Sequence, residues 1–269
     1  EAGCDKSDIG INSYKLPFIL KPRYGSGSRN VYIVNSISQW NDLQNSIFPS
    51  SEDYIIESVF EGDEYGVDGA VFNGKLHITL LRKKILTQPP FRQCVGYFSL
   101  PTDQYSKLYD YAAKHLQNIA LIIGMDNCLF HCDFIWNGSG MDIIEISPRP
   151  SGHNLHNLFT PLATGVSMID AYIDCMENKN SYICPKHISN MLIGYFDFEN
   201  CFINHIPTKE EFPVKLKESI IEYQCLMKSG YIKTAENGHA LMKRGFYIIK
   251  GNSFRDLIQK RNLLKCFFT

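Results

Sequence analysis

The sequence predicts an α+β protein whose strands pair as antiparallel hairpins. Asn137-Gly138-Ser139-Gly140 separates two apolar runs, and Asn73-Gly74 separates two more. An Asn-Gly turn between alternating hydrophobic segments is the strongest short-range hairpin signal. Between these hairpins, residues 102–123 carry apolar side chains at helical spacing. Strands and helices are therefore both expected, with the strands in antiparallel sheets.

The composition describes a globular chain without a strong charge bias. Its 269 residues are 44% hydrophobic and carry a formal net charge of −1. That balance gives no electrostatic case for nucleic acid or an anionic membrane, and no apolar run reaches the roughly 18 residues of a transmembrane helix. The nine cysteines are scattered without a Cys-x-x-Cys pair, which favours reduced thiols. We expect a cytoplasmic protein with small-molecule partners, and the sequence leaves its oligomeric state open, including a homodimer.

The hairpin over residues 129–147 places acidic side chains next to each other. Folding it about its turn puts Asp133 opposite Glu145 and His131 opposite Ser147. Residues two apart on a strand share a face, so Asp133, Glu145 and Ser147 should point the same way. Neighbouring carboxylates repel unless a cation lies between them, and oxygen ligands suit Mg²⁺ (or Mn²⁺). We predict a metal site here, with Arg149 as an anion-binding group nearby; solvated acids on a surface hairpin are the alternative.

The other face of this hairpin should be a core face. It carries Phe130, Phe134, Trp136, Ile144 and Ile146. Cys128 and Cys132 should lie on the face opposite His131, which disfavours a Cys–His metal site.

A glycine-rich loop near the N-terminus is a candidate phosphate site. Residues 16–22 and 31–34 read as strands, and Gly25-Ser26-Gly27-Ser28 lies between them. No helix follows the loop directly, so it is neither a Walker A nor a Rossmann motif. Its backbone N–H groups could still cover phosphates, with Lys21 as a point charge. A plain hairpin loop is the alternative.

The remaining elements follow from periodicity and capping residues. We expect strands over residues 53–60, 64–72, 75–81, 93–100, 191–196 and 246–249. Helices are expected over 37–47, capped by Ser36 or Ser38, over 168–176, capped by Ser167, and over 254–264, capped by Ser253. The helix over 102–123 should be capped by Thr102 and end at Gly124, with an apolar stripe of Leu108, Tyr111, Ala112, His115, Leu116, Ile119 and Ala120. Arg82, Lys83 and Lys84 could add cations to the phosphate site or form a solvated strand end.

In this order, the motifs resemble the ATP-grasp family, and most closely its members related to carbamoyl-phosphate synthetase and the amino-acid ligases. Five segments carry the resemblance: residues 18–22 followed by 25–27, residues 55–60, residues 61–65, residues 132–134 with 144–149, and residues 244–251. The family usually has Asn where this chain has Ser147. Twenty residues precede Lys21, so we expect either a fragment or a chain that lacks the family's N-terminal domain.

The resemblance implies a site for ATP between two subdomains, residues 1–60 and residues 61–269. It implies that the phosphates contact Lys21 and the loop of Gly25, Ser26, Gly27 and Ser28. Adenine would lie on Glu57, Ser58, Val59 and Phe60, with the ribose on Glu64, and Asp133, Glu145 and Ser147 would hold the metal.

The activity implied is that of an ATP- and Mg²⁺-dependent ligase. A carboxylate would be activated as an acyl phosphate, with Lys21 and Arg149 offsetting its charge, and an amine would then form the amide. Two alternatives stay open. One is phosphorylation of bicarbonate or carbamate on the same scaffold. The other is a nucleotide-binding module with weak or no turnover.

Overall fold

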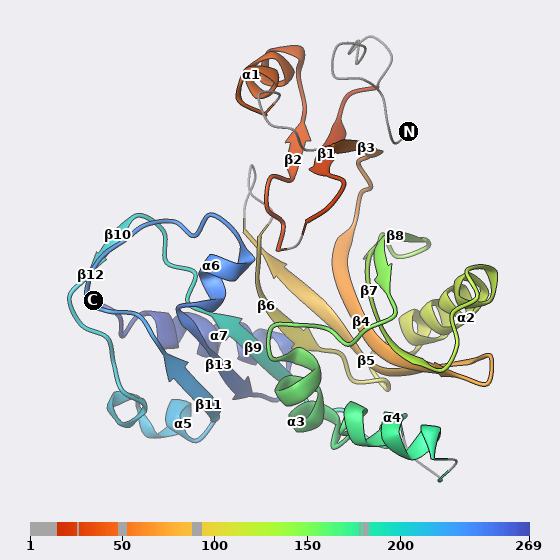
Figure 1. Ribbon diagram of the computed structural model, residues 1–269. Coiled ribbons are helices and arrows are strands. Elements are labelled where there is room, and N and C mark those ends of the chain that lie inside the picture. Colours follow the sequence, from red (N-terminus) through yellow and green to blue (C-terminus); the bar gives the residue numbers. More distant parts are fainter. Residues whose placement is uncertain (1–14, 26, 48–52, 88–92, 178, 180–182) are drawn as a thin grey trace.

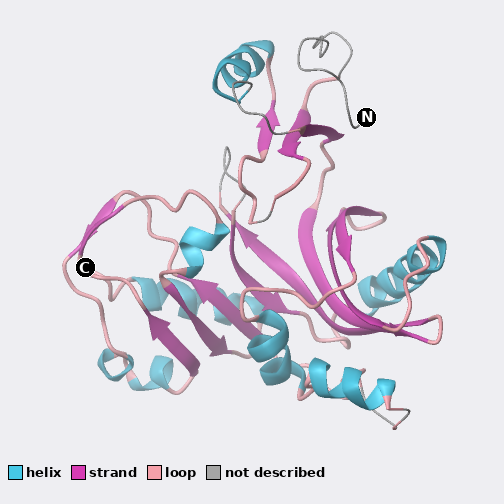
Figure 2. Cartoon of the chain, viewed as in Figure 1, coloured by secondary structure: helices cyan, strands magenta, loops and turns pink. Residues whose placement is uncertain are grey.

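The computed structural model describes residues 15–25, 27–47, 53–87, 93–177, 179 and 183–269. A small sheet lies above a much larger one, and helices surround the larger sheet (Figures 1 and 2). The described strands form sheets of three, eight and two strands, and every pairing is antiparallel. The predicted α+β class with antiparallel sheets is confirmed.

The small sheet has the strand order β2-β1-β3. It consists of β1 (Phe18–Pro22), β2 (Tyr32–Val34) and β3 (Tyr54–Ser58), and α1 (Ile37–Ile47) packs beside it. The Ser36 hydroxyl accepts a hydrogen bond from the backbone N–H of Gln39 at 3.2 Å, so Ser36 caps this helix. A small apolar core of Phe18, Leu20, Val34 and Trp40 holds the helix on the sheet.

The large sheet has the order β11-β13-β9-β6-β5-β4-β7-β8. Its strands are β4 (Asp63–Phe72), β5 (Lys75–Leu86), β6 (Cys94–Ser99), β7 (Cys128–Trp136), β8 (Met141–Ser147), β9 (Met191–Tyr195), β11 (Ile220–Cys225) and β13 (Gly245–Lys250). A separate ribbon pairs β10 (Cys201–Ile203) with β12 (Gly230–Ile232). The Asn73-Gly74 hairpin forms as predicted, with both turn residues at positive φ.

Besides α1, six α-helices are described, of which α2 and α7 are the longest. They are α2 (Ser106–Ile122), α3 (Thr160–Thr164), α4 (Met168–Met176), α5 (Val214–Lys217), α6 (Gly238–Met242) and α7 (Phe254–Lys265), together with a π-helical turn at Leu155–Phe159 and a 3-10 turn at Lys209–Glu211. Ser167 and Ser253 cap α4 and α7, as predicted. Among the described residues, no helix combines the length and apolar character needed to cross a membrane.

Helix α2 differs from the prediction in its start and its buried face. The helix begins at Ser106, because the N–H groups of residues 104 and 105 both bond the Pro101 carbonyl in a preceding turn. Thr102 is therefore not its cap. Tyr109 takes the buried position, and Tyr111 is 37% exposed. The Tyr109 hydroxyl accepts from the Leu81 N–H at 3.1 Å and donates to the Leu100 carbonyl at 2.8 Å.

The pairing of β5 with β6 separates the two faces of the large sheet. Lys83 is paired with Phe98, and Lys84 is paired with Tyr97. Neighbouring residues on a strand point to opposite faces, whereas directly paired residues share one. Phe98 contacts Phe254 of α7, with ring centroids 4.2 Å apart. The face with Lys83 is therefore covered by helix, and the face with Lys84 carries the polar site described below.

Candidate active site

The β7–β8 hairpin brings the predicted acidic residues together. Asp133 pairs with Glu145 and His131 pairs with Ser147, which is the register expected from the sequence. An irregularity follows, because Phe134 pairs with Ile143. The extra residue in β8 turns Ile143 toward the core. The prediction that Ile144 lies on the core face is therefore wrong, because Ile144 is not among the residues packed against the core.

Lys84 ties this hairpin to the neighbouring strand β4. Its ammonium lies 2.7 Å from Glu64 Oε1 and 2.5 Å from Asp133 Oδ2, and its side chain is 6% exposed. Burial lowers the pKa of Lys84, but the charges of Asp133 and Glu64 outweigh that effect and raise it well above its ordinary value. Burial would raise the pKa of Asp133, and Lys84 and His131 hold it well below its usual range. Both groups are therefore charged at neutral pH.

The three consecutive cations of β5 have separate partners. Arg82 and Asp68 form an ion pair in which both side chains are fully buried. Lys83 pairs with Asp63 at 2.5 Å on the helix-covered face. Only Lys84 enters the predicted site. The sequence grouped the three cations but could not distinguish their roles.

Asp68 lies at the centre of a buried polar cluster beneath the site. Its Oδ2 accepts hydrogen bonds from Arg82, from the Ser151 hydroxyl at 2.8 Å and from the Thr160 hydroxyl at 3.4 Å. His131 lies between Asp68 and Asp133. Burial lowers the pKa of His131, but the two carboxylates beside its ring nitrogens raise it to about 9. Sequence analysis assigned Asp68 no role.

Lys21 and Glu57 lie side by side on the small sheet. Their charged groups are 2.7 Å apart, with side chains 22% and 39% exposed. Glu57 lies in β3, and Ser58 is its last residue. Val59 and Phe60 follow in the link to β4, and Phe60 is 41% exposed. Lys21, expected at the phosphates, therefore lies next to Glu57, the first of the residues expected at the adenine.

The glycine loop contacts the C-terminal half of the chain. Gly25, Gly27 and Ser28 are described, whereas Ser26 lies outside the described residues. The Gly27 carbonyl accepts a hydrogen bond from the Gly238 N–H of α6 at 3.0 Å. Gly27 has φ +67°, and a Cβ there would lie 3.1 Å from the His239 ring. No local sequence pattern indicates this contact between the loop and α6.

His153 lies next to the contact between the glycine loop and α6. The rings of His153 and His239 meet edge to face with centroids 6.0 Å apart, and the His153 carbonyl accepts from the Tyr195 hydroxyl at 2.8 Å. Burial lowers the pKa of His153, and nearby His239 adds to that effect. Arg149 is exposed and donates to the Pro150 carbonyl at 3.1 Å.

The side chains at the hairpin fit a divalent cation. His131, Asp133 and Glu145 each offer a ligand atom, and these atoms lie within 4.8 Å of one another. Asp133 Oδ1 is buried without a hydrogen-bond partner. A buried carboxylate oxygen without a partner is costly, and a cation would satisfy it. The types of ligand atom, their spacing and the unpartnered oxygen of Asp133 therefore fit a divalent cation.

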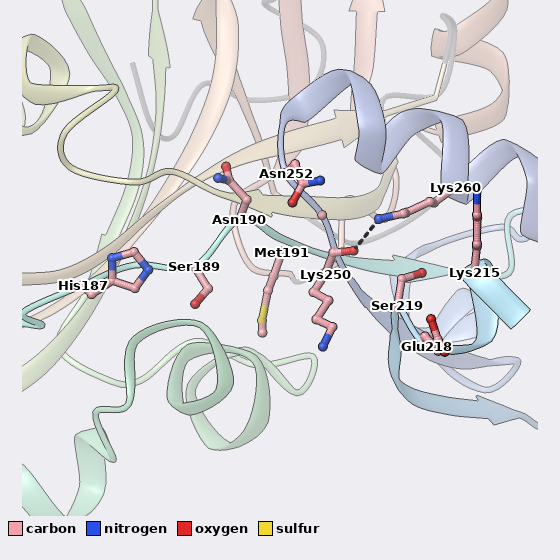
Figure 3. Close-up of a pocket in the computed structure, with 11 residues that line it drawn as sticks. His187, Ser189, Asn190, Met191, Lys215, Glu218, Ser219, Lys250, Asn252 and Lys260 are labelled. Carbon is pink, nitrogen blue, oxygen red and sulfur yellow. Dashed lines mark hydrogen bonds between the residues drawn. The ribbon is translucent and has the colours of Figure 1, made fainter.

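A separate depression lies away from this cluster (Figure 3). Its cavity of about 610 Å³ is lined by residues near the start of β9, the end of β13 and α5, including Lys215, Lys250 and Lys260. None of the predicted site residues lines it. Lys260 is engaged with Asp256 at 2.9 Å and with the Lys250 carbonyl at 3.1 Å.

Comparison with known proteins identifies the family. A family model described as "ATP-grasp domain" matches residues 14–156, which is more than half of the chain. The chain belongs to the ATP-grasp family. A relative, the uncharacterized protein y4rH of Sinorhizobium fredii, is 26% identical over 179 residues. The match covers 64% of this chain and 35% of that protein, so the chain spans about a third of the relative's length.

Solved structures show the same fold. L-amino acid ligase from Bacillus licheniformis superposes with a TM-score of 0.75 at 16% identity, over 99% of this chain and 66% of that one. The biotin carboxylase domain of Hydrogenobacter thermophilus 2-oxoglutarate carboxylase superposes with a TM-score of 0.64 at 14% identity, over 96% and 58% of the two chains. That second structure was solved with MgADP, ADP and bicarbonate. The expected ATP-grasp fold is confirmed.

Proposed function

We propose that this chain is an ATP-dependent ligase that joins a carboxylate to an amine, forming an amide with ADP and phosphate. The observation that carries the proposal is the cross-strand pair Asp133–Glu145, linked through Lys84 to Glu64. This arrangement offers metal ligands and a buried cation side by side. Phosphoryl transfer depends chiefly on such positioned charges.

The nucleotide is proposed to lie between two subdomains, residues 1–60 and residues 61–269. The small sheet would contribute Lys21 to the phosphates and the segment of Glu57, Ser58, Val59 and Phe60 to the adenine. Glu64 would take the ribose hydroxyls. The loop of Gly25, Ser26, Gly27 and Ser28 would cover the phosphates, and its hydrogen bond to α6 supports a closed position of that loop. A closed loop excludes water from a reactive intermediate.

Asp133 and Glu145 would hold Mg²⁺ or Mn²⁺, with Ser147 at the end of β8 as a further ligand or the partner of a bound water. A bound divalent ion would neutralise charge on the transferring phosphoryl group. Lys84 keeps Asp133 ionised and oriented, since it bonds Oδ2. Arg149 is exposed, which leaves its guanidinium available to hold a substrate carboxylate and then the acyl phosphate.

One observation favours a second candidate. The neighbouring biotin carboxylase domain was solved with bicarbonate. A bicarbonate- or carbamate-phosphorylating enzyme is therefore the alternative activity, and a nucleotide-binding module without turnover is the alternative from another class.

The test is ADP release from Mg·ATP in the presence of pooled amino acids, of other carboxylates with amines, or of bicarbonate. We expect release that requires a carboxylate and an amine and falls on the order of 100-fold in Glu145→Gln. Asp142→Asn, on the same strand, is the matched control and should leave the rate unchanged. Release that requires bicarbonate would establish the second candidate. Nucleotide binding without release from any pool would contradict the ligase proposal.

A further inference from the structure

His131 is the nitrogen-bearing member of the metal-ligand cluster. Its ligand atom lies within 4.8 Å of those of Asp133 and Glu145, and the side chain is 9% exposed. It stands directly opposite Ser147 in the β7–β8 ladder, on the same face as both carboxylates. The third ligand group that this face of the hairpin offers is therefore an imidazole nitrogen and not an oxygen.

The two ring nitrogens of His131 face different carboxylates. Nε2 lies 3.3 Å from Asp133 Oδ1, toward the proposed metal site. Nδ1 lies 3.4 Å from Asp68 Oδ1, on the buried side, and neither of these two atoms makes a hydrogen bond. The placement matches that of many metal-ligating histidines, in which a carboxylate next to one ring nitrogen leaves the other nitrogen to the metal.

Asp133 has one oxygen available on the same side. Lys84 occupies Oδ2, whereas Oδ1 is buried and has no hydrogen-bond partner. Asp68 is itself fixed by Arg82, Ser151 and Thr160. The His131 ring therefore lies between the fixed carboxylate of Asp68 and an oxygen of Asp133 that has no hydrogen-bond partner.

We infer that His131 is a protein ligand of the metal, together with Asp133 and Glu145, and that the site prefers a divalent transition ion such as Mn²⁺ to Mg²⁺. The inference rests on the metal site of the proposed function. Imidazole nitrogen favours transition ions, whereas Mg²⁺ strongly prefers oxygen and octahedral geometry. The competing arrangement is a protonated His131 that only bridges Asp68 and Asp133.

The test uses Mn²⁺ with ADP on the intact chain. Electron spin-echo modulation detects nitrogen bound to Mn²⁺, and labelling the protein with [¹⁵N]histidine assigns that nitrogen to a histidine. We expect a nitrogen coupling that changes on labelling and is absent in His131→Asn. His115→Asn is the matched control, since His115 lies on α2 and stacks on Tyr111.

Calorimetry gives the second readout. His131→Asn should weaken Mn²⁺ binding about tenfold or more and Mg²⁺ binding by less than roughly threefold. If Mn²⁺ binding depends on Glu145 but shows no histidine coupling in the unsubstituted protein, the inference is wrong and the proposed metal site stands. If Mn²⁺ binding does not depend on Glu145, the metal site of the proposed function is wrong as well. The unsubstituted protein alone decides the first point, so the test does not depend on the folding of a variant.

Discussion

The buried pair Asp68–Arg82 gives a sharp prediction about stability. Both side chains have no exposed surface. Asp68→Asn keeps the size of the side chain but removes its charge, which leaves the Arg82 guanidinium buried. The groups that remain near it are the Tyr97 ring, whose centroid lies 5.7 Å from the guanidinium carbon, and the Asp133 carboxylate, whose charge acts on Arg82. Removing one partner of a buried ion pair typically costs about 3–5 kcal/mol, so we expect a loss of that size in the free energy of unfolding.

Urea-induced equilibrium unfolding measures this loss. Asp63→Asn is the matched control, because Asp63 pairs with Lys83 and its side chain is 58% exposed. An exposed pair contributes about 0–1 kcal/mol, so the control should change little. Combining Asp68→Asn with Arg82→Met should recover most of the loss, since it removes the unpaired charge. A loss of less than about 1 kcal/mol in Asp68→Asn, or no recovery in the double variant, would refute this reasoning.

Three further predictions concern pH, the glycine loop and α2. Burial raises the pKa of Asp68, but Arg82 and His131 hold it well below its ordinary value. The ionised carboxylate therefore stabilises the fold fully above about pH 4, and this stabilisation is lost as the pH falls through the lowered pKa of Asp68. Acid unfolding should therefore be steeper in the unsubstituted protein than in Asp68→Asn. Gly27→Ala should weaken nucleotide affinity in a binding titration because of its φ of +67° and the nearby His239 ring. Gly25→Ala would meet only an ordinary contact at 4.0 Å and should weaken the affinity much less. Tyr109→Phe should cost about 1–3 kcal/mol in thermal or urea unfolding, since it leaves the Leu81 N–H and Leu100 carbonyl without their partner. An equal cost in Tyr111→Phe, on the exposed side of the same helix, would contradict that assignment.

The sequence alone determined the local elements and one half of the site. An Asn-Gly turn and alternating side chains define a hairpin without reference to the rest of the chain, so the pairing of Asp133 with Glu145 could be predicted. Helix starts at Ser36, Ser167 and Ser253 could also be predicted, because a cap bonds residues only three positions away. The predicted start of α2 was wrong, because a turn that is hydrogen-bonded to the Pro101 carbonyl precedes the helix.

The tertiary structure decided which distant residues complete the site. Lys84 reaches Asp133 because β4 lies between β5 and β7 in the large sheet, an order that no local pattern specifies. The glycine loop reaches Gly238 across more than two hundred residues of sequence. Asp68 gains its partners from β5, β7 and the segment after β8. The alternation of side chains along a strand predicts from the sequence which face of the sheet a residue occupies. Only the packing of strands and helices determines which other residues that face contacts.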